Sequence, residues 1–432
     1  LLPLRIRINY LETFGQILSA NKENLTKAIS QETGKPLWDA AGEVTAMLNK
    51  INISFEAYAL RCPELTKKQS QGISITRHKP HGVLAVFGPY NFPGHLPNGH
   101  IIPALLAGNT IVFKPSEQTP YVAELLMGYW RESGLPKGVI NLVQGGKTTG
   151  KLVAEHTEID GLLFTGSWQT GKLLAEQFAK FPQKILALEM GGNNPLVISN
   201  ISDVKIAAHL TILSAFLSSG QRCTCARRLI IFPTEQSDAF IDELIRMTQS
   251  IVVGAYDDIP EPFMGPIISS TTAEKLIEQQ KELLELGGRS LIPMSRLTRS
   301  PAYLTPGIID MTHAEERPDQ ELFGPLLQII RVKNFKAALI EANRTAYGLT
   351  AGIFTDSAEE YQEFYRQIKA GVINWNVQLT GASSAAPFGG IGKSGNHRPS
   401  ALYAADYCAH PVASLENPFL KSSNIILPGI SV

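Results

Sequence analysis

The hydrophobic residues of this chain follow a helical period first and a strand period later. Near the start, apolar residues such as Leu11 and Phe14 recur at helical spacing, and the pattern predicts helices over about 8–32 and 39–61. An alternating stretch, "GISITRHKP", then predicts an exposed strand over 72–80. The chain therefore opens with helices and turns to strands after about seventy residues.

From residue 82 onward, short and nearly continuous apolar runs alternate with helical patterns. This alternation is typical of parallel sheets that helices cover on both faces. We expect an α/β protein in which two parallel-sheet domains join near Gly192. The strands expected before that glycine are 82–89, 110–116, 138–146, 160–167 and 184–192, and those after it are 194–199, 226–233, 326–332, 349–355 and 370–376. Turn-forming residues crowd into 380–400, which we expect to be a long functional loop.

Length and charge narrow the class of protein. The 432 residues are too many for one ordinary core, so two or three domains are expected. A formal net charge of zero disfavours nucleic acid or an anionic membrane surface as a partner. No apolar run reaches the roughly 18 to 20 residues that span a bilayer. Four irregularly spaced cysteines form no disulfide framework, so we expect a cytoplasmic protein.

Three glycine-rich stretches nearly match a phosphate-binding loop, but each lacks a required residue. "GSWQTGKL" has Leu173 where a P-loop needs Ser or Thr, and the other two lack the first glycine. No G-x-G-x-x-G opens a strand-to-helix turn. "FTGSWQTGK" nevertheless places Gly166 and Gly171 between a strand and a helix, where backbone N–H groups can face a pyrophosphate. A tight turn without a ligand is the alternative.

The stretch "GQRCTC" places Cys223 and Cys225 around one threonine. A nucleophilic thiol needs a lowered pKa, which nearby arginines such as Arg222, Arg227 and Arg228 provide if they point inward. Two cysteines at this spacing are too few for a metal site, so no metal is expected. Buried, inert thiols remain the alternative, as does a hypothetical regulatory disulfide between the two.

Two further residues are suited to catalysis. Glu189 ends an apolar strand directly before two glycines, and ligands gather at the carboxyl ends of parallel strands. A buried carboxylate there acts as a general base if its pKa rises toward neutral pH, although a capping or ion-paired role is the alternative. Asn91, held between prolines in "GPYNFPGH", is a candidate oxyanion donor or simply a turn residue.

Together these stretches resemble the aldehyde dehydrogenase superfamily over essentially the whole chain. "YNFP", "FKPSE", "FTGSWQTG", "LEMGGNNP", "GQRC", "ELFGP" and "PFGGIGKSG" all occur in the family's order. The resemblance implies that Cys223 is the nucleophile, that Glu189 activates the deacylating water, and that Asn91 and the Cys223 N–H form the oxyanion hole. It implies an NAD site made of Lys114, Glu117, Gly166, Ser167, Trp168, Gln169, Thr170, Gly171, Glu321 and Phe323.

The same resemblance implies the domain organisation. The NAD-binding domain would comprise 1–61 and 81–191, the catalytic domain 192–405, and an oligomerisation segment 62–80 and 406–432. A homodimer or larger self-assembly is therefore expected. Members of the family normally carry several dozen further N-terminal residues, so we expect that the natural N-terminus is missing here.

Substrate and cofactor preference are expectations of the same kind. Glu117 would repel a 2′-phosphate, which favours NAD over NADP. "GHLPNGHIIPALLAGN" and "FLSSGQRCTCARRLI" resemble the members that oxidise N-succinylglutamate 5-semialdehyde in arginine degradation. Another acidic semialdehyde, of succinate or glutamate, is an alternative, as is a catalytically inactive member of the fold. The candidates for binding the substrate carboxylates are Arg227, His95, Lys393 and Arg398.

Overall fold

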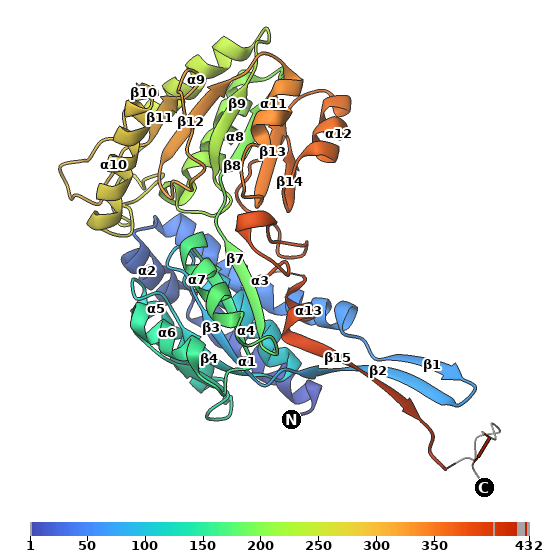
Figure 1. Ribbon diagram of the computed structural model, residues 1–432. Helices are drawn as coiled ribbons and strands as arrows, with labels where there is room; N and C mark the ends of the chain where they lie inside the picture. Colours follow the sequence, from blue (N-terminus) through green and yellow to red (C-terminus); the bar gives the residue numbers. More distant parts are fainter. Residues whose placement is uncertain (1, 401, 421–427, 430–432) are drawn as a thin grey trace.

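The computed structural model describes residues 2–400, 402–420 and 428–429. Two lobes are stacked one above the other, and a strand arm projects sideways from the lower lobe (Figure 1). The helices are α1 Leu4–Ala20, α2 Lys22–Thr33, α3 Leu37–Arg61, α4 His95–Ala107, α5 Pro120–Glu132, α6 Lys147–Glu155, α7 Trp168–Phe178, α8 Val204–Phe216, α9 Ser237–Gln249, α10 Ser270–Glu285, α11 Phe335–Ala342, α12 Ala358–Gln367 and α13 Ala404–Cys408. Two short 3-10 helices span Leu217–Gly220 and Gly392–Ser394.

The strands form three separate sheets. They are β1 Leu65–Gln69, β2 Gly72–Pro80, β3 Val83–Phe87, β4 Thr110–Lys114, β5 Ile140–Leu142, β6 Gly161–Gly166, β7 Ile185–Met190, β8 Asn194–Ile198, β9 Ala226–Ile231, β10 Arg289–Ile292, β11 Gly307–Asp310, β12 Leu326–Arg331, β13 Thr350–Phe354, β14 Val372–Trp375 and β15 Ala409–Glu416. The orders are β5-β4-β3-β6-β7 in the lower lobe, β10-β11-β12-β9-β8-β13-β14 in the upper lobe and β1-β2-β15 in the arm.

The five-stranded sheet is parallel throughout and has one reversal in its strand order. The chain moves outward from β3 through β4 to β5, then returns to the other side of β3 with β6. Such a reversal leaves a crevice outside the carboxyl ends of the two central strands, and ligands bind there. Helices cover both faces of this sheet, and successive residues of β3 point to opposite faces. Leu84 packs beneath α1, α3, α4 and α5, whereas Ala85 packs beneath α6 and α7.

The seven-stranded sheet repeats this design in the upper lobe. Only β10 runs antiparallel to its neighbour. Strand β7 belongs to the first sheet and β8 to the second, with three residues between them. The chain thus passes from the carboxyl edge of the lower sheet directly to the amino edge of the upper one. These two edges face each other across the waist of the molecule (Figure 1).

The arm consists of antiparallel strands. Strand β15 pairs with β2 along its whole length, from Ala409 opposite Pro80 to Glu416 opposite Ile73. All five residues of β1 are exposed, and β1 forms an outer edge of this sheet. Of the predicted segment 406–432, residues 421–427 and 430–432 lie outside the described residues.

Local details depart from the sequence expectations. The helix expected over 8–32 is two helices, because the chain breaks at Asn21, whose side-chain amide donates to the Ile17 carbonyl at 2.9 Å. The strand expected over 138–146 is reduced to three residues, Ile140–Leu142, at the sheet edge. Helix α10 was not expected, because few of its residues are apolar and only Ala273, Leu276 and Leu283 are buried.

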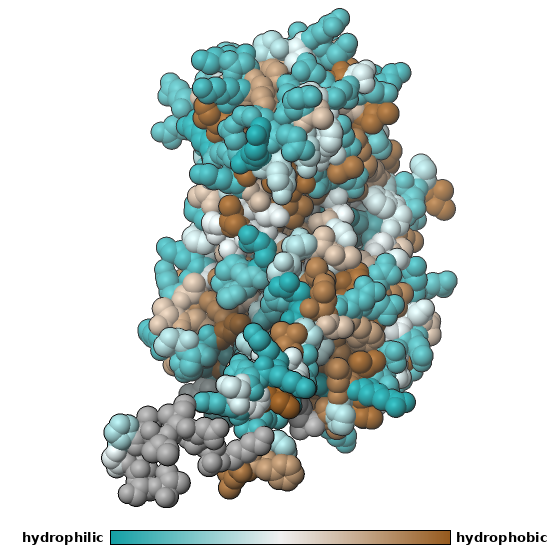
Figure 2. Space-filling model, turned by 90° about the vertical axis from the view of Figure 1, so that its right-hand side faces the viewer, coloured by the Kyte–Doolittle hydropathy of each residue, from teal (hydrophilic) through white to brown (hydrophobic). Residues whose placement is uncertain are grey.

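The surface carries no single apolar face in the view of Figure 2. The upper lobe presents mainly hydrophilic residues, and in the lower lobe hydrophobic residues are interspersed among hydrophilic ones. Within the part of the chain that the structure describes, no helix is long and apolar enough to cross a bilayer.

Candidate active site

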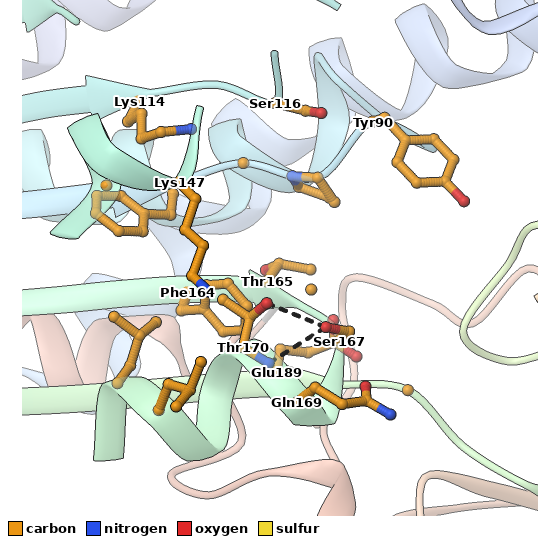
Figure 3. Close-up of a pocket in the computed structure, with 18 of the residues that line it drawn as sticks. Tyr90, Lys114, Ser116, Lys147, Phe164, Thr165, Ser167, Gln169, Thr170 and Glu189 are labelled. Atoms are coloured by element: carbon orange, nitrogen blue, oxygen red, sulfur yellow. Dashed lines mark hydrogen bonds between the residues drawn. The ribbon is translucent and has the colours of Figure 1, made fainter. Parts of the chain in front are cut away.

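A cavity of about 1120 Å³ opens at the carboxyl edge of the five-stranded sheet. Its walls come from the ends of β3 and β6 and from the starts of α6 and α7, and Figure 3 shows these side chains converging on one hollow. Cys223, Glu321, Phe323 and Tyr347 close one end of the cavity from the upper lobe. The cavity therefore runs from the topological reversal between β3 and β6 to the segment that precedes β9.

A strained turn carries Cys223 into this cavity. Ser218 and Ser219 both have left-handed backbone conformations, with φ of 53° and 57°, and Gly220 follows with φ of 69°. Such conformations are costly for serine and persist only where the surroundings fix them. Here Ser219 Oγ donates to the Gly265 carbonyl at 2.7 Å. The Gly220 backbone packs so closely against the Gly324 carbonyl that a Cβ atom would lie 2.1 Å from it.

Asn194 fixes the segment from Cys223 to Cys225 from the other side. Its side-chain amide donates to the Cys223 carbonyl at 2.7 Å and to the Cys225 carbonyl at 2.9 Å. Its oxygen accepts from the Thr350 N–H at 3.1 Å. The sequence reasoning did not select Asn194, although it stands within the quoted stretch "LEMGGNNP".

The surroundings of Cys223 keep its thiol protonated. Burial raises the pKa of Cys223 well above its usual range, and the carboxylates of Glu189 and Glu321 add to this shift, whereas Arg227 opposes it. Contrary to expectation, Arg228 contributes nothing, because its guanidinium donates to the carbonyls of Asn193, Glu341 and Ala342.

Cys225 occupies a separate, fully buried position. Its thiol donates to the Leu217 carbonyl with an Sγ–O distance of 3.8 Å. All four cysteines are free thiols. This placement suits the interpretation that Cys225 packs beneath the nucleophile segment.

Glu189 lies on β7 with its carboxyl group buried beside the thiol. Burial raises its pKa from 4.5 to about 8, with a further contribution from Glu321, while the nearby Cys223 thiol opposes the shift. Among the described residues its Oε1 atom has no hydrogen-bond partner. A carboxyl group with a pKa near neutrality and a free oxygen is suited to accept a proton from water.

Asn91 reaches the same point from the turn after β3. It is buried, and its side-chain amide donates to the Gln221 carbonyl at 2.9 Å, two residues before Cys223. An amide has two N–H donors, so one remains for a ligand. Within the described residues the Cys223 N–H has no acceptor either. The structure thus brings Cys223, Glu189 and Asn91 together at one end of the cavity.

The predicted cofactor residues fall into two groups. Those that line the cavity are Lys114, Glu117, Gly166, Ser167, Gln169, Thr170, Glu321 and Phe323. Ser167 caps α7 by accepting from the Thr170 N–H at 3.3 Å, so the start of this helix faces the cavity. Trp168 and Gly171 are not among the lining residues. Gly171 instead packs against Met190, where a Cβ atom would lie 2.2 Å from the sulfur.

Both ends of the cavity carry charged residues. At one end, the Lys114 ammonium lies 3.8 Å from the exposed Glu117 carboxylate. At the other, Glu321 accepts from the Gly192 N–H at 3.1 Å and lies 4.0 Å from Arg227. Burial raises the pKa of Glu321 to about 7, while Arg227 opposes that shift. No ligand set for a metal, of three or more His, Cys, Asp or Glu, occurs among the described residues.

Sequence reasoning missed several lining residues. Tyr90 and Lys147 stood inside stretches that were singled out for other reasons, and Ser116 and Thr165 adjoin predicted residues. Figure 3 shows Lys147 extending from α6 toward the start of α7. A lysine at that point adds positive charge to a helix N-terminus, and both favour an anionic ligand.

The four residues expected to bind substrate carboxylates do not line the cavity. Arg227 is fully buried and donates to the carbonyls of Gly220, Gly324 and Arg222. Arg398 donates to the Gly390 carbonyl at 2.6 Å, and the Lys393 ammonium lies over the Trp168 and Tyr347 rings. His95 is half-buried, and desolvation together with neighbouring cations lowers its pKa well below the usual range.

Comparison with known proteins places this geometry in a family. Residues 1–411 match the model of the aldehyde dehydrogenase family. N-succinylglutamate 5-semialdehyde dehydrogenase of Ectopseudomonas mendocina is 54% identical over 426 residues, which cover 99% of this chain and 88% of that protein.

Solved structures agree with this assignment. Gamma-glutamyl-gamma-aminobutyraldehyde dehydrogenase from Burkholderia cenocepacia superposes with a TM-score of 0.90 at 28% identity, covering 96% of this chain and 84% of that one. Glyceraldehyde-3-phosphate dehydrogenase from Methanocaldococcus jannaschii, solved with NADP, gives 0.88 at 26% identity, covering 96% and 90%. The predicted fold is confirmed, and the chain belongs to the aldehyde dehydrogenase family.

Proposed function

We propose that this protein oxidises N-succinyl-L-glutamate 5-semialdehyde to N-succinyl-L-glutamate with NAD as the electron acceptor. The observation that carries the proposal is the convergence of Cys223, Glu189 and Asn91 at the closed end of a dinucleotide-sized cavity. The 54% identity to a dehydrogenase of that name supports the choice of substrate. Such a reaction turns aldehyde, water and the oxidised cofactor into acid, reduced cofactor and a proton.

Cys223 begins the proposed reaction as the nucleophile. Glu189, which lies beside the thiol, takes its proton as the sulfur adds to the aldehyde carbon, and later passes that proton to solvent. The addition converts a poor hydride donor into a thiohemiacetal. The second N–H of the Asn91 amide and the N–H of Cys223 hold the developing oxyanion. One such donor typically lowers the barrier by about 3 to 4 kcal/mol. A nicotinamide held beside Glu321 and Phe323 would supply the hydride acceptor, and loss of the hydride would leave a thioester on Cys223.

Glu189 completes the cycle by activating water against the thioester. Its free Oε1 atom accepts the water proton, and the hydroxide so formed releases the acid and regenerates the thiol. A carboxyl group at the usual pKa of 4.5 would be a weaker base. The burial that raises the pKa of Glu189 therefore serves this step.

Residues at the two ends of the cavity would hold NAD. Lys114 and Glu117 fit the adenosine ribose at one end, because together they offer a donor and an acceptor for its hydroxyls. Glu321 and Phe323 fit the nicotinamide half beside Cys223. The start of α7 and Lys147 lie between the two ends and fit the diphosphate. The negative charge of Glu117 disfavours the 2′-phosphate of NADP.

We also propose that the chain associates with a second copy of itself through the arm of strands β1, β2 and β15. Among the described residues nothing pairs with the outer edge of β1, and exposed Leu65 and Leu415 lie on the same sheet. Long exposed edges are otherwise blunted or covered in native proteins. A second copy of the chain that covers the arm would bury both the edge and these side chains.

The choice of substrate predicts a clear order of specificity constants. Purified protein should oxidise N-succinylglutamate 5-semialdehyde with a kcat/KM at least about tenfold above that for succinate semialdehyde or glutamate semialdehyde, because a pocket built for a polar group rejects substrates that lack it. The measurement is NADH formation with each aldehyde. A preference for either unsuccinylated aldehyde would refute the substrate proposed here.

The nucleophile assignment predicts different outcomes for the two neighbouring cysteines. Cys223→Ala should lower kcat by a factor of roughly 10⁴ or more, because the covalent step is lost. Cys225→Ala serves as the matched control and should retain most activity, since its thiol only donates to the Leu217 carbonyl. Mass spectrometry after substrate addition should detect an acyl adduct on Cys223. Equal activity of the two variants would contradict the assignment.

The raised pKa of Glu189 predicts the pH dependence of thioester hydrolysis. The carboxyl group is protonated below about pH 8 and becomes a base above it, so the hydrolysis rate should rise through that value. Glu189→Gln should abolish the rise and cause the acyl adduct on Cys223 to accumulate. Rapid-quench measurement of the adduct across pH tests this. An unchanged pH profile in the variant would exclude Glu189 as the base.

The cofactor proposal predicts the effect of removing one charge. Glu117→Gln should raise the ratio of kcat/KM with NADP to that with NAD by roughly tenfold, about 1.4 kcal/mol, because repulsion of the 2′-phosphate is removed. Titration of protein fluorescence should show the same change in the two dissociation constants. The control Glu124→Gln, at an exposed position on the neighbouring helix α5, should leave both ratios unchanged.

A further inference from the structure

Arg222 directly precedes Cys223 in the chain, but its side chain points toward Ser218, Asp39 and Phe92. It precedes Cys223, so the two Cα atoms are about 3.8 Å apart. Its guanidinium carbon lies 5.0 Å from the centre of the Phe92 ring, and Phe92 directly follows Asn91. A cation and an aromatic ring therefore meet beside the nucleophile and the oxyanion donor.

One edge of the Arg222 guanidinium is held firmly, and the other edge is free. Nε donates to Ser218 Oγ at 2.8 Å, and Nη2 donates to Asp39 Oδ1 at 2.6 Å. Ser218 also donates to the second oxygen of Asp39, which closes a small network. Within the described residues nothing accepts from Nη1. Because a guanidinium has five N–H donors in two forks, the outer fork remains available for a carboxylate.

The surroundings of Arg222 contain more positive than negative charge. Glu43 is fully used, since it accepts from the Lys35 ammonium at 2.7 Å and from the N–H groups of Gly94 and His95. Asp39 pairs with Arg222 itself. Lys50 is buried, and no carboxylate of the described residues lies within 4.0 Å of it.

The basic residues around Arg222 gather near His95. Lys50, Lys35 and Arg222 all lie close enough to His95 to help lower its pKa, so the histidine itself is neutral. Three basic groups face two carboxylates near His95, and the excess positive charge depends on Lys50, whose pKa burial lowers to about 7. A buried excess of this sign attracts an anion more strongly than the same charge in water would.

The role of Arg222 differs from that of Arg227. Arg227 lowers the pKa of the Cys223 thiol, and its two terminal nitrogens donate to three backbone carbonyls. Arg222 is not among the groups that act on that thiol, and its side chain is 15% exposed. Its guanidinium lies over the Phe92 ring and outside the lining of the cofactor cavity, so its free Nη1 is available to a group that approaches Cys223 from the Phe92 side.

We propose that Arg222, held by Asp39 and Ser218, binds a carboxylate of the substrate through its outer guanidinium fork. This inference rests on the proposed function, in which the aldehyde carries two carboxylates. The nearer one is four carbon–carbon bonds from the reacting carbon, which spans about 5 Å. Arg222 is thus a specificity-determining residue that separates acidic from neutral aldehydes.

The test compares an acidic with a neutral aldehyde in variants of Arg222. Arg222→Met should lower kcat/KM for N-succinylglutamate 5-semialdehyde roughly 100-fold and change kcat/KM for pentanal by less than about threefold, because only the acidic substrate loses a charged partner. Arg222→Lys retains the charge without the fork and should lose roughly tenfold with the acidic aldehyde. Arg246→Met, which removes an exposed arginine from α9, is the control and should change neither value.

The outcomes separate this inference from the proposed function. Equal losses with both aldehydes in Arg222→Met, or no loss with either, would overturn the carboxylate site while leaving the substrate assignment in place. A wild-type protein that does not prefer the acidic aldehyde would overturn both. Since Arg222→Met leaves Asp39 without its partner, melting temperatures are measured in parallel. If that variant unfolds, the loss of selectivity in Arg222→Lys decides the question.

Discussion

The side-chain amide of Asn194 is the contact on which the geometry of the site depends. It donates hydrogen bonds to the backbone carbonyls of Cys223 and Cys225 and accepts one from the N–H of Thr350 in β13. Its own residue begins β8, five positions after Glu189. One buried amide therefore fixes the distance between Cys223 and Glu189, the proposed nucleophile and base. In a low-dielectric interior such a fully satisfied amide is rigid, because every alternative leaves a polar group unpaired.

This contact works because two sheets present opposite edges to one another. The carboxyl edge of the lower sheet supplies the cavity and Glu189, while the amino edge of the upper sheet supplies Cys223, Glu321 and Phe323 just before β9 and β12. Neither lobe contains the whole site. The short link between β7 and β8 keeps the two edges in register, so the cavity that would hold the cofactor ends at the nucleophile.

Electrostatics divide the surroundings of the nucleophile into two unlike sides. On the cavity side, Glu321 raises the pKa of Glu189, and both carboxylates raise the pKa of the Cys223 thiol, whereas Arg227 lowers the pKa of that thiol and of Glu321. A positively charged ring is favoured on this side. On the side of Phe92, arginine and lysine exceed the carboxylates, which favours an anionic group. The two sides thus suit a cationic cofactor ring and an acidic aldehyde.

The sequence by itself determined the fold class and the family, and it supplied the residues that we propose for the chemistry. Short apolar runs of strand length can be recognised in the sequence whatever they pack against. Motifs such as "LEMGGNNP" and "GQRC" consist of consecutive residues, so they too can be recognised without the fold. Only the tertiary structure decided where each side chain points and which residues it contacts. Arg222 donates to Asp39, which lies 183 positions earlier in the chain, and Gly171 packs against Met190. Arg227 was expected to face the substrate but donates to backbone carbonyls instead. Burial and pairing depend on distant segments meeting, and no local pattern records that.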